Sequence, residues 1–231
     1  MKVILPGDKI SDSPVRTENA IVENGKTYAT VMGMLDESRG AFIPLESIWY
    51  PREGDFAVGI IENSKNNVYT VALESPFRGL ILPPPRPRFG GRGRFGDRGR
   101  PPMQEERREI MHIGDVVSVF VKEVKREADQ VILILDRPKR LFGGKLMEVR
   151  SSKVPRIIGK DSTMLRQLED GTRCTILVGL NGLIWLKGEN VPLAQKAIWK
   201  IQEEAHVSGL TERITELLAG NDNGNSNNEG R

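Results

Sequence analysis

The chain has 231 residues, 38% of them apolar and only 6% aromatic, so its composition favours two or three small modules over one deeply cored enzyme domain. One cysteine excludes an internal disulfide framework and a cysteine-rich zinc site, and two histidines leave little for a metal centre. A net charge of +3 identifies a nucleic-acid-binding protein only if the positive charge is concentrated in one segment.

The sequence shows no signal for export or for insertion into a membrane. Residues 1–14 lack the apolar core of a signal peptide, and no segment approaches the ~18 apolar residues needed to cross a bilayer. Together with the single cysteine, this predicts a soluble protein in a reducing, cytoplasmic compartment, without a membrane partner.

Residues 1–52 are predicted to form a small N-terminal β domain. Two short segments, 20–23 and 26–31, flank the dipeptide Asn24-Gly25, which is typical of the tight turn in a β-hairpin. Residues 41–45 are a further predicted strand, placed at a sheet edge because Pro44 has no amide hydrogen for a central ladder. A unit this short is expected to pack on its neighbour or on a partner protein.

Residues 53–136 are predicted to form a small closed barrel of five strands. The predicted strands share a high content of β-branched and aliphatic residues and are separated by turn clusters; they are residues 54–61, 68–73, 78–82, 114–121 and 131–135. A Gly-Asp pair introduces two of them. This layout resembles the ribosomal S-one type of OB fold, a common RNA-binding module.

Residues 83–102, inserted between the third and fourth strands, consist almost entirely of proline, glycine and arginine. Such a segment buries too little apolar surface to offset the entropy of ordering, so we expect a mobile loop. Arginine pairs with phosphates, and phenylalanine stacks on bases. The candidate RNA contacts here are Arg86, Arg88, Phe89, Arg92, Arg94, Phe95, Arg98 and Arg100. The alternative is a solvated, low-complexity insertion with no dedicated ligand.

Residues 137–219, which begin with a connector over 137–144, are predicted to form a third, α+β module. Its order of strand, helix, helix, strand, strand, helix is that of a KH domain of the first type. Residues 220–231 are rich in asparagine and glycine and are expected to be a disordered tail.

The segment Gly159-Lys160-Asp161-Ser162 occupies the place of the KH loop that clamps a nucleic-acid backbone. The KH family loop is Gly-x-x-Gly, and its second glycine is absent here. Gly159 and Lys160 are therefore the candidate RNA contacts, and the alternative is that Asp161 or Ser162 caps the following helix by accepting its free amide hydrogens.

Residues 172–188 are predicted to form two short strands joined by a tight turn, in which Asn181-Gly182 adopts positive φ angles. The turn sequence, Gly179-Leu180-Asn181-Gly182, resembles the Gly-x-Asn-Gly signature of the RNA-binding cap subunits of the exosome, the RNA-degrading complex of archaea and eukaryotes. The order of small β domain, S-one barrel and KH domain is also that of this family. The resemblance covers nearly all of residues 1–219, and the retained glycine and lysine of the KH loop are more similar to the archaeal member.

The resemblance implies roles for individual residues. It assigns Gly179, Asn181 and Gly182 to packing between the barrel and the KH domain, and Trp185 is interpreted as core or interface rather than as a base-stacking platform. It also implies a non-catalytic protein without a cofactor, of which three copies form a cap on a hexameric ring of RNase PH-like subunits that performs the chemistry.

We therefore predict an RNA-binding cap subunit that captures single-stranded RNA and feeds it to a phosphorolytic ring for 3′-to-5′ degradation. The sequence contains no Walker loop, HExxH motif or nucleophile elbow, and its acidic residues are scattered. Two alternatives stay open: a transcription or translation factor that joins an S-one barrel to a KH module, and a nuclease subunit that is active alone.

Overall fold

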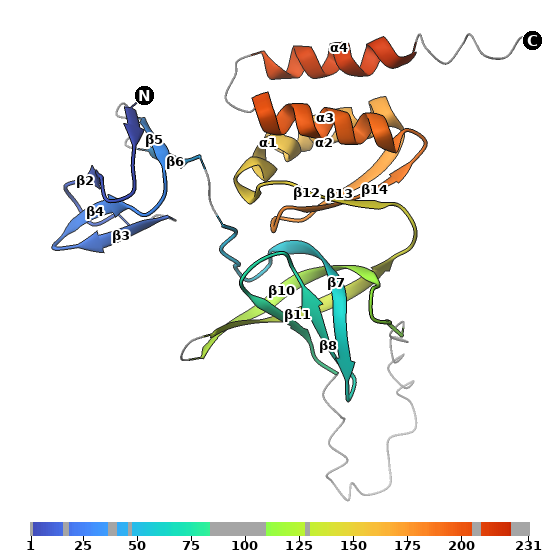
Figure 1. The fold of residues 1–231 in the computed structure, drawn as a ribbon, viewed down its shortest axis with the longest axis horizontal. Coiled ribbons are helices and arrows are strands. Elements are labelled where there is room, and N and C mark those ends of the chain that lie inside the picture. The colour runs from blue at the N-terminus through green and yellow to red at the C-terminus, as the bar shows by residue number, and fades with distance from the viewer. Residues whose placement is uncertain are drawn as a thin grey trace, which may run out of the picture.

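The computed structural model describes residues 2–15, 19–36, 41–45, 48–83, 110–127, 130–204 and 209–222. Figure 1 shows three parts in chain order: the N-terminal strands, a barrel, and a sheet covered by helices. The predicted fold class is confirmed, with a small N-terminal β domain, an OB-type barrel and a KH domain of the first type.

The N-terminal part contains two antiparallel sheets of three strands each. One has the order β1 (Lys2–Ile4), β5 (Gly33–Asp36), β6 (Ala41–Pro44), and the other has the order β2 (Lys9–Ser11), β4 (Lys26–Ala29), β3 (Ala20–Glu23). The sequence analysis missed β1, β2 and β5, because strands of three or four residues are too short to show a period of two and these, unlike β3 and β4, are not joined by an Asn-Gly turn.

Two local predictions for this part are confirmed. Asn24 and Gly25 connect β3 to β4 with φ angles of 48° and 75°, as a two-residue hairpin turn requires. Strand β6, which contains Pro44, lies at the edge of its sheet.

The barrel has the closed order β10-β11-β9-β8-β7. Its strands are β7 (Phe56–Lys65), β8 (Val68–Ala72), β9 (Arg78–Ile81), β10 (Val116–Glu127) and β11 (Gln130–Leu141). Strands β9 and β11 are parallel, the other neighbours are antiparallel, and pairing of β10 with β7 closes the barrel. The core inside the barrel is aliphatic, and Ala57, Val117 and Leu133 are fully buried in it.

The last barrel strand corrects one prediction, because β11 continues to Leu141 and therefore includes the first residues of the expected connector. Asp136 is paired with Phe120 and Lys139 with Ser118, so Arg137 and Pro138 together lie opposite one residue of β10. This is a β-bulge, and a bulge accommodates a proline that cannot donate to the ladder.

The two Gly-Asp pairs form equivalent turns in front of β7 and β10. Gly54 and Gly114 both have a φ of 90°. In each turn the aspartate carboxylate, of Asp55 or Asp115, accepts the amide hydrogen of the residue three positions earlier, at 3.0 and 2.6 Å. The repeat seen in the sequence therefore marks two similar entries into the barrel.

The KH domain is an antiparallel sheet with helices on one face. Its elements are β12 (Lys145–Glu148), α1 (Val154–Ile158), α2 (Thr163–Thr172), β13 (Cys174–Val178), β14 (Leu183–Gly188) and α3 (Val191–Glu204), with single turns of 3-10 helix at Ser151–Lys153 and Lys160–Ser162. The strand order is β12-β14-β13. Figure 1 shows α1, α2 and α3 on one side of this sheet and the barrel on the other.

A further helix, α4 (Leu210–Asp222), packs on α2 and α3. Ile214 and Leu218, four residues apart, are buried against the KH core. The sequence analysis did not identify this helix, and the expected tail from residue 220 overlaps its last three residues. The rest of that tail, residues 223–231, lies outside the described residues.

Candidate nucleic-acid interface

The barrel packs on the helix-free face of the KH sheet through a small apolar core. Val58 and Leu141 come from the barrel, Leu183 and Trp185 come from β14, and all four are buried. The Trp185 indole Nε1 donates a hydrogen bond of 2.7 Å to the carbonyl oxygen of Gly143, on the segment that joins the two domains. Trp185 therefore has its ring in the interface and its polar edge paired.

Asn181 joins the two domains through three hydrogen bonds. Its side chain, only 3% exposed, accepts from the amide nitrogen of Val58 at 3.2 Å and donates to the carbonyl oxygens of Val58 and Leu73 at 2.8 Å each. The KH side chain thus pairs backbone groups of the barrel that would otherwise be buried and unsatisfied.

The hairpin loop, residues 179–182, has a different backbone from the one predicted. It is a four-residue turn closed by a 3.0 Å hydrogen bond from the Gly182 amide to the Gly179 carbonyl. Only Gly182 has a positive φ, of 92°, and Asn181 does not. The prediction of positive φ at Asn181 was wrong because β13 ends at Val178, so the loop is longer than a two-residue turn.

Both glycines of the hairpin loop lie where a side chain does not fit. A Cβ at Gly179 would overlap the Asn181 Oδ1 atom and lie 2.7 Å from the amide nitrogen of Val58. A Cβ at Gly182 would overlap the carbonyl oxygen of Val149, in addition to the strain of its φ. The structure therefore places Gly179 and Asn181 at the contact of barrel and KH domain, and Gly182 against Val149 within the KH domain.

The KH loop, residues 159–162, connects α1 to α2 on the helical side of the domain. Gly159 has a φ of 74° and a ψ of 174°, a conformation that essentially only glycine adopts, while Asp161 and Ser162 have φ angles of 51° and 60°. Within the described residues, no side chain caps the N-terminus of α2, although Ser162 occupies the cap position. The capping alternative is therefore wrong, because a cap side chain reaches the free amides from an extended backbone and that of Ser162 is left-handed.

Two cationic side chains lie at or next to the KH loop. Arg156 on α1 and Lys160 are both exposed, and neither forms an ion pair with a described residue. The Thr163 hydroxyl donates a 2.7 Å hydrogen bond to the Lys160 carbonyl oxygen, which fixes the backbone under that side chain. Charge in this loop is thus available for an anionic ligand.

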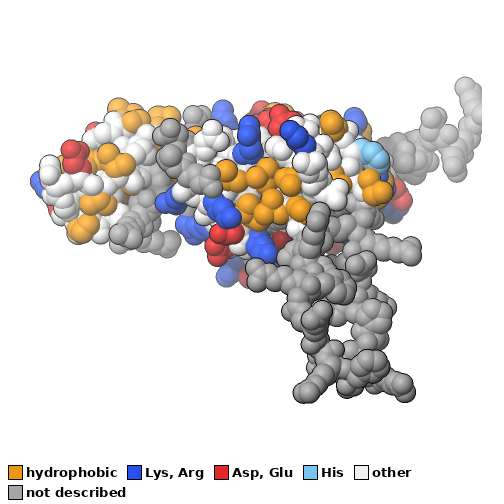
Figure 2. Space-filling view, turned by 90° about the horizontal axis from the view of Figure 1, so that it is seen from below, with side chains coloured by type: hydrophobic (Ala, Val, Ile, Leu, Met, Phe, Trp, Pro, Cys, Tyr) orange, Lys and Arg blue, Asp and Glu red, His pale blue; other side chains and the backbone are white. Residues whose placement is uncertain are grey.

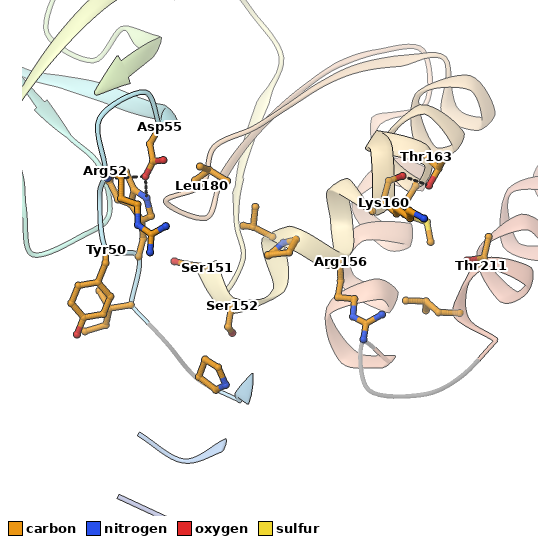
Figure 3. Close-up of a pocket in the computed structure, with 18 residues that line it drawn as sticks. Tyr50, Arg52, Asp55, Ser151, Ser152, Arg156, Lys160, Thr163, Leu180 and Thr211 are labelled. Atoms are coloured by element: carbon orange, nitrogen blue, oxygen red, sulfur yellow. Dashed lines mark hydrogen bonds between the residues drawn. The ribbon is translucent and has the colours of Figure 1, made fainter. Parts of the chain in front are cut away.

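These cations line a pocket of about 810 Å³ that also involves the linker, residues 48–52, between the N-terminal sheets and the barrel. Figure 3 shows Tyr50 and Arg52 on the linker side and Arg156 and Lys160 on the KH side. The charged residues among the described lining are three cations and one carboxylate, Asp55. The pocket is therefore positively charged overall.

The linker is held in place at Trp49. This residue is buried in the barrel core, and its Nε1 atom donates to the Asp55 carboxylate at 3.0 Å. Earlier in the chain, the Ser152 hydroxyl donates to the carbonyl oxygen of Leu45 at 3.3 Å. The sequence analysis missed this linker, and its one available signal was a tryptophan shortly before a Gly-Asp pair.

At the second Gly-Asp turn, the pKa of Asp115 is lowered. The main cause is the hydrogen bond from the His112 amide, and the Arg140 guanidinium, 2.6 Å from the carboxylate, lowers it further, while burial acts in the opposite direction. Arg140 also lies 4.7 Å from the centre of the Phe142 ring. This cluster fixes the start of β10 to the end of β11.

Figure 2 views the molecule from the barrel side. Apolar side chains gather in the middle of this face, with lysine and arginine side chains beside them. The predicted contacts of the insertion, Arg86, Arg88, Phe89, Arg92, Arg94, Phe95, Arg98 and Arg100, lie outside the described residues. Of the predicted RNA contacts, only Gly159 and Lys160 are described, and they lie together in the KH loop.

Within the described part of the chain, no helix is long and apolar enough to cross a membrane. In the same residues, no group of three or more His, Cys, Asp or Glu side chains is placed to hold a metal ion.

Comparison with known proteins agrees with the architecture. Residues 144–192 match the family model of the KH domain. A crystal structure described as an exosome complex RNA-binding protein superimposes with a TM-score of 0.59 at 29% identity, covering 77% of this chain and 98% of that one.

Three similar curated proteins carry the name exosome complex component Rrp4. The protein of Methanobrevibacter smithii is 31% identical over 94% of this chain and 70% of its own length. That of Methanothermus fervidus is 32% identical over 94% of both chains, and that of Methanosarcina acetivorans is 34% identical over 94% of this chain and 81% of its own. The resemblance stated from the sequence is confirmed: this chain belongs to the family of the exosome complex component Rrp4.

Proposed function

We propose that this chain is the non-catalytic RNA-binding cap subunit of an archaeal-type exosome. In this role it captures single-stranded RNA and feeds it to a phosphorolytic ring for 3′-to-5′ degradation in the cytoplasm. The observation that carries the proposal is the similarity to Rrp4 proteins over 94% of the chain, which spans the N-terminal sheets, the barrel and the KH domain.

The geometry of the described residues supports RNA capture by two domains that are fixed to each other and that carry cationic side chains on their surface. Asn181 and Trp185 hold the barrel and the KH domain together, so groups on the two domains keep their relative positions. Arg156 and Lys160 offer charge to a phosphate backbone, and the arginines of residues 83–102 are proposed to add to it. Binding through phosphates tolerates many sequences and weakens with salt.

The composition of the N-terminal sheets favours binding to a protein partner. Their described core is small, consisting of Ile4, Ala29 and Leu35 with two partly buried neighbours. Val3 and Ile21 are each more than half exposed. Since exposed apolar area on so small a unit favours association, we propose that this part docks on a hexameric ring of RNase PH-like subunits, with three copies forming the cap.

A pull-down of the tagged chain from native extract, followed by mass spectrometry and RNA-decay assays, tests this function. Recovery of ring nuclease subunits, with RNA decay in the complex and none by the chain alone, is the expected result. Recovery of polymerase or ribosome components would favour a transcription or translation factor, and decay by the lone chain would identify a nuclease subunit.

The role of the insertion is tested separately. Replacing Arg86, Arg88, Arg92, Arg94, Arg98 and Arg100 by serine is expected to weaken binding of single-stranded RNA and to flatten its dependence on salt. Unchanged affinity and an unchanged salt slope would show that residues 83–102 do not contact RNA.

A further inference from the structure

We propose that the pocket between the linker and the KH helix α1 is a composite nucleotide site, with one wall from each. In this site single-stranded RNA crosses the pocket, with phosphates on Arg156 and Lys160 at the KH wall and one base stacked on Tyr50 at the linker wall. The proposal rests on the proposed function, and it adds the linker, residues 48–52, as a second wall opposite the KH loop.

The size of the pocket suits such a ligand. Its volume of about 810 Å³ lies within the range of roughly 300 to 1,000 Å³ that is usual for small-molecule sites. A nucleotide with part of its neighbour has this scale. Bases that are free to stack on a protein side chain are those of a single strand.

The charge of the pocket suits a phosphate. Its cations come from both walls, Arg52 from the linker and Arg156 and Lys160 from the KH domain. The one described carboxylate, Asp55, already accepts hydrogen bonds from the Trp49 indole and the Arg52 backbone. Its carboxylate thus binds groups of the linker turn, while Arg156 and Lys160 form no ion pair with a described residue and can bind an anionic ligand.

An aromatic ring lies on the linker wall, across the pocket from the KH cations. Tyr50 lines the pocket and is 46% exposed, while the adjacent Trp49 is 7% exposed. Trp49 is buried in the barrel core, whereas Tyr50 stays outside it and accessible to a ligand. Proteins hold single-stranded nucleic acid with aromatic rings and cationic side chains in one groove.

The linker is ordered before any ligand arrives. The Trp49 indole is bound to Asp55, and the Leu45 carbonyl is bound to the hydroxyl of Ser152 in the KH domain. Little further entropy is lost when a nucleotide binds between walls that already have their positions. RNA in this pocket would contact the KH domain and the linker that leads to the N-terminal sheets, and so would hold these parts together.

Fluorescence anisotropy with a labelled 20-nucleotide single-stranded RNA, titrated with the full chain at several salt concentrations, tests the site. Arg156→Gln and Lys160→Gln are each expected to weaken binding by about threefold to tenfold and to reduce the slope of log affinity against log salt by about 0.7. Lys196→Gln removes one exposed charge from α3, outside the pocket, and serves as the matched control.

The stacking contact has its own readout. Tyr50→Leu is expected to weaken binding by about fivefold or more without changing the salt slope, and Tyr50→Phe, which keeps the ring, is expected to restore affinity. All variants are repeated in the chain whose six insertion arginines are serine, so that the insertion does not mask the pocket.

The outcomes separate this site from the proposed function. If the unmodified chain fails to bind the RNA, the proposed function fails. If it binds and the Tyr50, Arg156 and Lys160 variants all behave like Lys196→Gln, the composite site is wrong while RNA capture stands. If only Tyr50→Leu behaves like the control, the linker wall is refuted.

Discussion

The KH domain carries two glycine-led loops that differ in burial, in hydrogen bonding and in charge. The hairpin loop, residues 179–182, is buried, and its Asn181 side chain makes three hydrogen bonds to the barrel. The KH loop, residues 159–162, has two left-handed residues that are not glycine and an exposed lysine. Satisfied polar groups in a buried loop favour a structural role, and local strain with uncommitted charge favours a binding role.

The largest expected effect is at Asn181, because its loss leaves backbone groups of Val58 and Leu73 buried without partners. Asn181→Ala is expected to lower the free energy of unfolding by about 3 kcal/mol, measured by urea denaturation. Asn63→Ala, at an exposed position on β7, is the matched control and should change it little. Equal effects of the two substitutions would contradict the role of Asn181 at the interface.

The second effect concerns the glycine that ends the hairpin loop. Gly182→Ala is expected to cost about 2 kcal/mol or more, since it adds both backbone strain and overlap with the Val149 carbonyl. Gly114→Ala has nearly the same φ but open space around the added carbon, so it isolates the strain, at about 1 kcal/mol. If Gly182→Ala lowers the free energy of unfolding no more than Gly114→Ala does, the hairpin loop can shift to accommodate the added methyl group.

Sequence reasoning succeeded where the determining interactions are local. Asn24-Gly25 determines its turn through its own backbone preferences. Pro44 lacks an amide hydrogen, so it is disfavoured in a central strand whatever the rest of the fold. The resemblance at Gly179-Leu180-Asn181-Gly182 also pointed to the correct family.

Sequence reasoning failed where partners are distant in the chain. Asn181 forms hydrogen bonds with residues 123 and 108 positions away, so no local sequence pattern predicts these bonds. The linker pocket joins residues near position 50 to residues near position 156, and only the fold brings them together. The bulge at Pro138 was hidden because proline usually ends a strand.

A smaller effect is expected in the KH loop. Ser162→Gly removes the strain of a left-handed serine but adds freedom to the unfolded chain, so a gain of up to about 1 kcal/mol in unfolding free energy is expected. Thermal unfolding of this variant and of Gly182→Ala, measured together, tests the expected gain in stability for one and the expected loss for the other. A clear loss of stability would mean that the Ser162 side chain has a structural partner after all.

The smallest effect concerns pH and lies outside both loops. Because the folded-state pKa of Asp115 is lowered, its carboxylate contributes stability above its unfolded-state pKa, and that contribution is lost as the pH falls through the lower, folded-state value. Asp115→Asn should therefore be less stable than the unmodified chain at neutral pH, with the difference shrinking below pH about 4. Melting temperatures measured from pH about 7 to 3 test this, and a constant difference would contradict it.

The most direct test of the contrast between the loops measures the melting temperature and the affinity for single-stranded RNA on the same preparations of Lys160→Gln and Asn181→Ala. The structure predicts an unchanged melting temperature with weaker RNA binding for Lys160→Gln. For Asn181→Ala it predicts a lowered melting temperature, with unchanged affinity at a temperature where the variant is folded. Full RNA affinity in Lys160→Gln, or equal loss of affinity in a folded Asn181→Ala, would contradict the assignment of binding to one loop and structure to the other.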